Sequence, residues 1–216
     1  MTVDIDKAYS LLQRKVQEFR VPVVDLIQVQ TKDPFKVLVA TILSARTKDA
    51  VTVEACKRLF AKVSSPQQLQ KVSLRKLEGL ISPVGFFRNK AKYLKALPAH
   101  LERFDGKVPS EIDELLTLPG VGRKTANLVR AVAFSKDAIC VDVHVHRIMN
   151  RLGYIKTSTP LQSEMVLRQK LPRRYWQTVN TVFVAFGQQV CRPVSPHCSK
   201  CPLSHLCPRN GVKTSR

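Results

Sequence analysis

Apolar residues recur along most of the chain at three- and four-residue steps, which is the spacing of one face of an amphipathic helix. The first such stretch contains Ile5, Ala8, Leu12, Val16 and Phe19. Similar spacing predicts further helices over about 48–60, 66–80, 88–103, 111–117, 123–134, 143–152, 161–170 and 173–188. No segment shows the two-residue alternation that is typical of a half-buried strand. The pattern therefore predicts an all-α protein.

Two local signals mark where helices begin. Asp33 followed by Pro34 is typical of an N-cap with a proline at the first helical position. The run that follows, FKVLVATIL, is too uniformly apolar for a surface helix, so we expect a central one. Ser110 with Asp113 three residues later resembles a capping box, which predicts a helix start at that point.

Charge narrows the choice of partner. The chain has 216 residues, enough for one large domain or two small ones, and 44% of them are apolar, enough for a core. Its net charge is +20, and the 52 residues after Glu164 contain nine basic and no acidic side chains. Such an excess points first to nucleic acid, then to an anionic membrane surface, with a merely solvated basic end as the alternative.

The sequence also predicts where the protein resides. No apolar run approaches the roughly 18 residues that a membrane span needs. The first twenty residues are charged throughout, unlike a secretory signal peptide. We therefore expect a soluble, intracellular (cytoplasmic, nucleoid-associated) protein without a membrane partner. We also expect a monomer.

A glycine-rich turn separates two of the predicted short helices. It reads Leu118-Pro119-Gly120-Val121-Gly122, and the next helix is expected to begin at Arg123. Proline ends the preceding helix, and the two glycines permit close approach of main-chain N–H groups to a ligand. Together with the positive end of the following helix, such a turn suits a phosphate. Ordinary corners between helices use glycine as freely, so both interpretations stay open.

Four cysteines lie close together near the C-terminus. Cys191, Cys198, Cys201 and Cys207 have the spacing C-x6-C-x2-C-x5-C, a density typical of a metal site. Disulfides do not suit an intracellular chain. Zinc ribbons usually place two C-x2-C pairs well apart, so the single loop favours a [4Fe–4S] cluster over zinc. Cys56 and Cys140 have apolar neighbours and are predicted to be core residues.

Three motifs together resemble one protein family. The segment LPGVGRKTAN, the segment VDVHVHR at 141–147 and the cysteine loop are similar to the endonuclease III family of helix-hairpin-helix DNA glycosylase/AP lyases. The resemblance implies that the hairpin grips the DNA backbone through residues Leu118, Gly120, Val121, Gly122 and Arg123. It also implies that the four cysteines hold the cluster, and that Arg192 and Lys200 on the loop face DNA phosphates.

The same resemblance implies the catalytic pair. Lys124 would be the nucleophile that displaces an oxidised pyrimidine and forms a Schiff base with the sugar, and Asp142 would be its partner. A lysine amine attacks only when neutral, which the helix N-terminus and Arg123 favour and Asp142 opposes. The carboxylate in turn can accept a proton and stabilise the cationic sugar. Alternatively, Asp142 is a plain N-cap and Lys124 a phosphate contact.

A base inside a duplex must be flipped out before its C1′ can be attacked. By likeness to the family, two loops are candidates for filling the gap. Arg46 stands where many relatives carry glutamine, and Phe86 stands where leucine is common. Phe86 is predicted either to enter the duplex as a wedge or to pack in the core.

The resemblance also implies the domain organisation. A six-helix barrel domain would span residues 26–136 with the hairpin at 118–122, and an iron–sulfur cluster domain would combine 1–25 with 137–216. The predicted function is a bifunctional DNA glycosylase/AP lyase acting on double-stranded DNA with a damaged base or an abasic site. The alternatives are a mismatch-specific monofunctional glycosylase and a non-enzymatic DNA-binding module. An adenine mismatch glycosylase needs a glutamate where this chain has Thr41.

Overall fold

The computed structural model describes residues 3–19 and 33–216, and within those ranges its regular structure is entirely helical. The all-α prediction is confirmed. The described residues form two compact units, one made of 3–19 with 139–216 and the other of 33–138. The predicted boundary between residues 25 and 26 lies outside the described residues, and the domain assignment stays a prediction. No helix in the described ranges is long and apolar enough to cross a bilayer.

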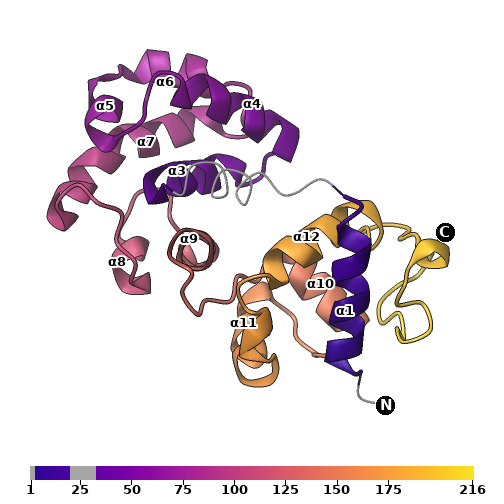
Figure 1. Ribbon diagram of the computed structural model, residues 1–216. Coiled ribbons are helices and arrows are strands. Elements are labelled where there is room, and N and C mark those ends of the chain that lie inside the picture. The colour runs from indigo at the N-terminus through magenta and orange to yellow at the C-terminus, as the bar shows by residue number, and fades with distance from the viewer. Residues whose placement is uncertain (1–2, 20–32) are drawn as a thin grey trace. The chain divides into compact units, whose positions relative to one another are not determined.

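The unit 33–138 is organised around one central helix. Helix α3 (Pro34–Ser44) has eight buried residues among its eleven, so the prediction of a central helix is confirmed. It packs against α9 (Arg123–Phe134), α4 (Asp49–Phe60) and α7 (Phe87–Leu101), as Figure 1 shows. The remaining elements of the unit are α4 (Asp49–Phe60), α5 (Pro66–Lys71), α6 (Leu74–Ile81), α7 (Phe87–Leu101), the 3-10 turn η1 (Glu102–Phe104) and α8 (Ile112–Leu116).

The eight buried positions of α3 are Phe35 and the unbroken run Val37–Leu43, with half-buried Lys36 between them. The helix begins as predicted, because the Asp33 carboxylate accepts the Phe35 N–H at 2.9 Å and Pro34 occupies the first turn. A helix that is apolar on all sides needs neighbours on all sides. The other helices of this unit supply them.

Two predicted helix boundaries in this unit are wrong. The helix expected over 66–80 is two helices, because Val72 is extended and the Ser73 hydroxyl caps α6 by accepting the Lys76 N–H. The capping box predicted at Ser110 does not form. Helix α8 begins after Glu111 without a side-chain cap, which leaves Ser110 outside the helix.

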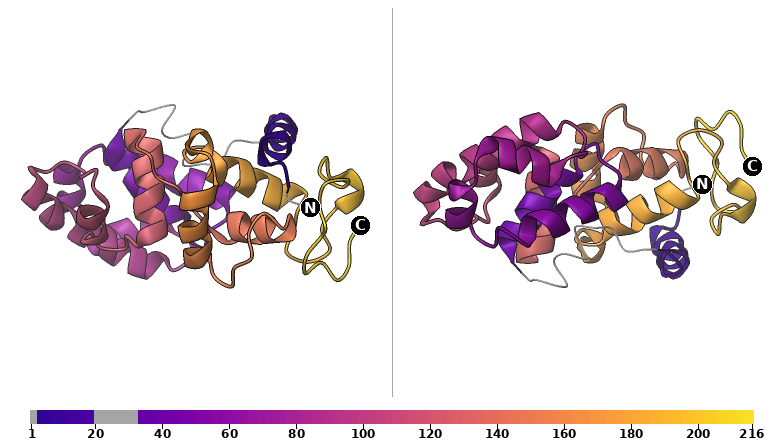
Figure 2. Two further views of the ribbon diagram at one scale, coloured as in Figure 1. Left: turned by 90° about the horizontal axis from the view of Figure 1, so that it is seen from below. Right: turned by 90° about the horizontal axis from the view of Figure 1, so that it is seen from above.

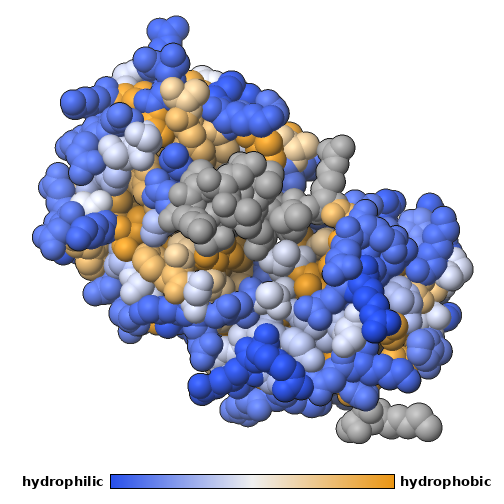
Figure 3. Space-filling model, in the orientation of Figure 1, coloured by the Kyte–Doolittle hydropathy of each residue, from blue (hydrophilic) through white to orange (hydrophobic). Residues whose placement is uncertain are grey.

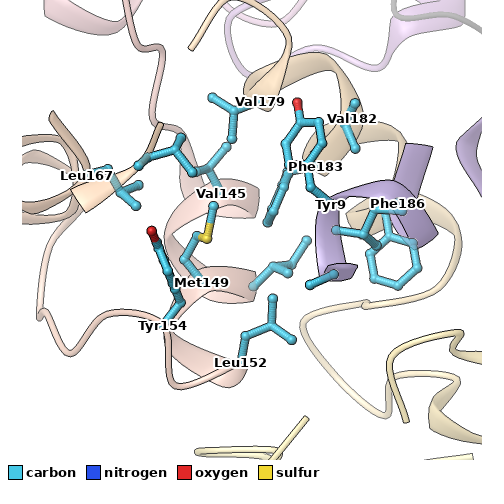
Figure 4. Close-up of a cluster of buried hydrophobic side chains, with 14 of the residues drawn as sticks. Tyr9, Val145, Met149, Leu152, Tyr154, Leu167, Val179, Val182, Phe183 and Phe186 are labelled. Atoms are coloured by element: carbon cyan, nitrogen blue, oxygen red, sulfur yellow. The ribbon is translucent and has the colours of Figure 1, made fainter. Parts of the chain in front are cut away.

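The second unit has its own core (Figure 4). Its elements are α1 (Ile5–Val16), α10 (Val143–Arg151), α11 (Pro160–Lys170), η2 (Arg173–Tyr175), α12 (Val179–Gln189) and η3 (Cys198–Lys200). Helix α12 packs against both α10 and α1, and the two views of Figure 2 show α10 and α12 next to each other. Tyr9, Met149 and Phe183 are among its fully buried side chains.

The helix predicted over 173–188 is interrupted. Residues Arg173–Tyr175 form a single 3-10 turn, and α12 begins only at Val179. The buried Trp176 lies between them and donates its indole N–H to the Leu171 carbonyl at 2.9 Å, which fixes the chain at this corner. On the face shown in Figure 3, hydrophilic residues predominate.

Candidate functional site

The glycine turn between α8 and α9 has the geometry of a helix corner with an open outer side. Gly120 has φ +77°, a backbone conformation that favours glycine, whereas Gly122 has φ −97°, which any residue adopts. A Cβ on Gly120 would lie 2.7 Å from Cδ2 of Tyr93, so the ring packs directly on that glycine. A Cβ on Gly122 would meet nothing within 4 Å.

The apolar residues of the turn anchor it to its own unit. The Leu118 and Val121 side chains are buried, and the Val121 N–H donates to the Leu118 carbonyl at 3.2 Å. Gly120 and Gly122 are exposed. If this turn binds DNA, Leu118 and Val121 therefore contribute main-chain groups and correct placement rather than side-chain contacts.

Lys124 lies in the first turn of α9 and is exposed, next to half-buried Arg123. The helix begins at Arg123, as predicted. Its N-cap is Gly122, and no side chain caps it, whereas side-chain oxygens cap α3, α5, α6 and α10. This end of α9 therefore combines a lysine, an arginine and the positive end of a helix without a local carboxylate or hydroxyl cap.

Asp142 is the N-cap of α10, in the other unit. Its Oδ1 accepts the N–H groups of His144 at 2.8 Å and Val145 at 3.0 Å, and the residue is buried. The N-cap interpretation is therefore confirmed as a structural role. Because Lys124 belongs to the unit 33–138, the pairing of the two side chains stays a prediction.

The four cysteines of the loop line one cavity. Cys191, Cys198, Cys201 and Cys207 surround it together with Arg151 and other residues. In the described part of the chain, no three His, Cys, Asp or Glu side chains are arranged to hold a single metal ion. A cubane cluster needs a different arrangement, since each thiolate binds a different iron. Four thiols around one cavity fit that donor set.

Burial, together with the three neighbouring thiols, raises the pKa of the Cys201 thiol to about 11. Burial also raises the pKa of Cys207. Thiols that face one another in a partly buried cavity are costly to ionise unless a cation compensates the charge. This electrostatic environment suits a metal centre and does not suit free thiolates.

Helix α10 holds the loop in place. Arg151 Nη1 donates to Cys191 Sγ at 3.3 Å and to the Arg192 carbonyl at 2.6 Å, and Arg147 Nη2 donates to the Cys191 carbonyl at 2.8 Å. The Cys207 thiol donates to the Arg151 carbonyl at 3.4 Å. Arg192 and Lys200 are exposed on the loop, as a role in phosphate contact requires.

Two residues predicted from the family likeness lie together in the unit 33–138. The Arg46 guanidinium carbon is 5.7 Å from the centroid of the Phe86 ring. Both residues have left-handed backbone conformations, with φ 52° and 56°, which is uncommon for non-glycine residues. Phe86 is 61% exposed, so the core alternative for it is wrong. Its neighbour Phe87 is half-buried under Arg88.

Sequence reasoning missed two residues of this region, both on α7. Lys90 is 5% exposed and binds the loop that carries Arg46, and Tyr93 supports Gly120. Their positions four and seven residues after Phe86 could have indicated this, because that spacing places Phe86, Lys90 and Tyr93 on one face of a helix. Nothing in the sequence indicates that this particular lysine is buried.

Thr41 has a purely structural environment. It is buried in α3, and its Oγ1 donates to the Val37 carbonyl at 2.7 Å. An adenine mismatch glycosylase needs a glutamate at this position, so the interior hydroxyl here provides no support for that alternative.

Comparisons with known proteins show the family of this chain. A model of the HhH-GPD superfamily of base excision DNA repair proteins matches residues 39–173. Endonuclease III of Thermotoga maritima is 46% identical over 176 residues, which cover 81% of this chain and 83% of that protein. A solved non-covalent endonuclease III–DNA complex has a TM-score of 0.84 at 37% identity and covers 97% of both chains. A trapped covalent endonuclease III–DNA intermediate has a TM-score of 0.77 at 38% identity, over 87% of this chain and 93% of that one. The chain therefore belongs to the endonuclease III family of the HhH-GPD superfamily.

Proposed function

We propose that Lys124 and Asp142 give this base excision repair protein its DNA glycosylase and AP lyase activities, with oxidised pyrimidines in duplex DNA as substrates. The observation that carries the proposal is the position of Lys124. It is an exposed lysine in the first turn of a helix that no side chain caps, directly after an open glycine turn. A nucleophile for a sugar bound through its phosphates needs this combination of access and positive potential.

The reaction would proceed by covalent catalysis. The neutral Lys124 amine attacks C1′, and the bond from C1′ to the base breaks with its electron pair leaving on the base. Opening of the sugar ring gives a protonated Schiff base between Lys124 and C1′. A base then takes a proton from C2′, a C2′–C3′ double bond forms, and the C3′–O bond breaks with the phosphate as leaving group, which cuts the strand on the 3′ side. Hydrolysis of the Schiff base releases the lysine.

Asp142 would accept the proton that the attacking amine loses and stabilise the positive charge that develops on the sugar. Its N-cap hydrogen bonds to His144 and Val145 restrict the carboxylate to one orientation. Such restriction favours catalysis because the group need not be ordered during the reaction. The structural and the catalytic role are therefore compatible.

Double-stranded DNA with a damaged base or an abasic site is the proposed partner, bound by a monomer. The net charge of +20 supplies the attraction to phosphate. The glycine turn would grip the DNA backbone through main-chain N–H groups, while Arg192 and Lys200 contact phosphates from the cysteine loop. The place of action would then be the nucleoid, where the DNA is.

Phe86 and Arg46 would fill the gap that an extruded base leaves. An exposed aromatic side chain next to a cation, both on strained backbone, can stack on bases and contact phosphate or the opposite base. The strain itself supports a functional role, because left-handed non-glycine residues are enriched at such sites.

The cofactor proposed for the loop is a [4Fe–4S] cluster held by Cys191, Cys198, Cys201 and Cys207. The cluster would supply no substrate chemistry; when bound, it would crosslink the loop. The chain's own residues, Arg151 and Arg147, hold the first cysteine from α10. Stable placement of the loop would in turn fix Arg192 and Lys200 for contact with DNA.

Borohydride trapping tests the proposed function. The wild-type protein is incubated with duplex DNA carrying an abasic site or an oxidised pyrimidine, and reduction should convert the Schiff base into a stable protein–DNA crosslink. Lys124→Ala should abolish trapping and strand cleavage. Lys107→Ala, which removes an exposed lysine of the same unit, is the matched control and should trap like the wild type. Trapping by Lys124→Ala at the wild-type level would refute the assignment.

A further inference from the structure

The two loops that carry Arg46 and Phe86 are joined by one buried side chain. Lys90 Nζ donates to the Leu43 carbonyl at 2.8 Å, to the Ala45 carbonyl at 2.5 Å and to Thr47 Oγ1 at 3.1 Å. An ammonium group has three N–H donors, and these three acceptors match them. All three acceptors belong to the end of α3 and the loop after it, whereas Lys90 stands in the first turn of α7 after Phe86.

The hydroxyl of Thr47 extends this connection. It accepts the Gly85 N–H at 3.2 Å as well as the Lys90 ammonium, and it donates to the Ala45 carbonyl at 3.2 Å. A Cβ on Gly85 would lie 2.5 Å from the Arg46 carbonyl oxygen, so only glycine permits the two loops to approach this closely. Arg46 itself forms one side of this contact, and Phe86 directly follows Gly85 on the other side.

Both of those residues depend on external support. Each has a left-handed backbone conformation, which costs a non-glycine residue free energy and persists only where the surroundings enforce it. The Arg46–Phe86 contact itself is exposed and therefore weak. The hydrogen bonds of the buried Lys90 side chain lie behind this contact and can hold the two loops in register.

We propose that Lys90 is a positioning residue that holds the Arg46 loop against the start of α7, so that Arg46 and Phe86 enter the duplex as one rigid unit. This inference rests on the proposed function. Lys90 acts through the two loops and does not touch the DNA, because it is 5% exposed. Its loss should therefore impair the step that needs the loops, extrusion of a base from a duplex, and spare the reaction of Lys124 with an accessible sugar.

The experiment measures the activity of Lys90→Met on two substrates. This substitution keeps most of the side-chain volume and removes the three donors. Base release from duplex DNA containing thymine glycol should fall at least tenfold. Borohydride trapping on single-stranded abasic DNA, where no base must be extruded, should fall less than twofold. Lys92→Met removes an exposed lysine of the same helix and should change both by less than twofold.

A second arm keeps the test decisive if Lys90→Met folds poorly. Thr47→Val removes only the hydroxyl and leaves Lys90 its two carbonyl acceptors, so it should lower base release about threefold and leave trapping unchanged. In a Phe86→Ala background, either substitution should lose most of its effect, because both act through the same loop.

Two results would overturn the inference. One is an equal loss on both substrates by Thr47→Val, which removes a single hydroxyl and leaves Lys90 in place. The other is a double variant, Lys90→Met with Phe86→Ala, in which the loss of base release equals the product of the two single losses. Independent sites produce this result. Trapping by the wild-type protein keeps the proposed function intact in either case, so the two failures are distinguishable.

Discussion

The two glycines of the turn should respond differently to the same added methyl group. In Gly120→Ala the alanine must adopt φ +77°, which costs about 1–2 kcal/mol. Its Cβ would also lie 2.7 Å from Cδ2 and 3.0 Å from Cγ of Tyr93. That ring is 41% exposed and can turn away, so the steric share is small. Since alanine also restricts the unfolded chain slightly, we expect a net destabilisation of about 1–2 kcal/mol.

Gly122→Ala is the matched control. Its φ of −97° suits alanine, and the new methyl group meets nothing within 4 Å. The free energy of unfolding should therefore stay within about 0.5 kcal/mol of the wild type, as for most unstrained surface substitutions. DNA affinity should nevertheless fall several-fold, because the methyl group would stand where a phosphate approaches the main chain.

The assay measures urea unfolding and binding to a non-cleavable abasic duplex for both variants at one salt concentration. The double variant Gly120→Ala, Tyr93→Ala lacks the ring that the new Cβ would meet. It therefore separates the steric from the backbone contribution to the destabilisation by Gly120→Ala. Equal destabilisation by the two alanines would refute the conformational argument. Unchanged DNA affinity of Gly122→Ala would refute the placement of the phosphate at this turn.

Three further outcomes are expected. Asp142→Asn should keep the α10 cap, so its free energy of unfolding should stay within about 0.5 kcal/mol of the wild-type value, yet it should lose most base release. Asp142→Ala should lose base release as well, and urea unfolding should show a further loss of about 1 kcal/mol of stability. Burial lowers the pKa of Lys90 to about 8, so the folded protein releases a proton between pH 8 and 10.5 that the unfolded chain still binds. Stability should therefore rise across that window by up to about 3 kcal/mol relative to Lys90→Met, and parallel pH profiles in urea unfolding would contradict this. Cys201→Ser should reduce the iron content and the absorbance near 400 nm of the purified protein, and a colourless wild type containing one zinc would contradict the cluster.

Local sequence signals predicted the elements that local forces determine. Asp33 with Pro34 marked the start of α3, and the glycine turn marked the start of α9, because caps and left-handed turns involve only neighbouring residues. The same local logic failed where two signals compete. Over 66–80 the apolar spacing continues through Ser73, but its hydroxyl caps a new helix and breaks the pattern.

The candidate site could be proposed from the sequence where residue type alone indicates the chemistry. Four cysteines in one loop and a lysine after a glycine turn are informative without coordinates. The burial of Lys90 is not, because its acceptors come from a segment more than forty residues earlier in the chain. The exposure of Phe86 likewise depends on a left-handed backbone that nothing in the sequence requires.

The two proposed catalytic side chains both lie at helix starts, and the difference between those starts is informative. At α10 the Asp142 carboxylate caps the first turn and compensates the positive end of the helix dipole. At α9 the N-cap is a glycine, and Arg123 and Lys124 add further positive charge. We therefore expect a phosphate to gain more at α9 than at α10. This difference supports our proposal that the turn before Lys124 binds the DNA backbone and that Asp142 acts on the sugar rather than on the phosphates.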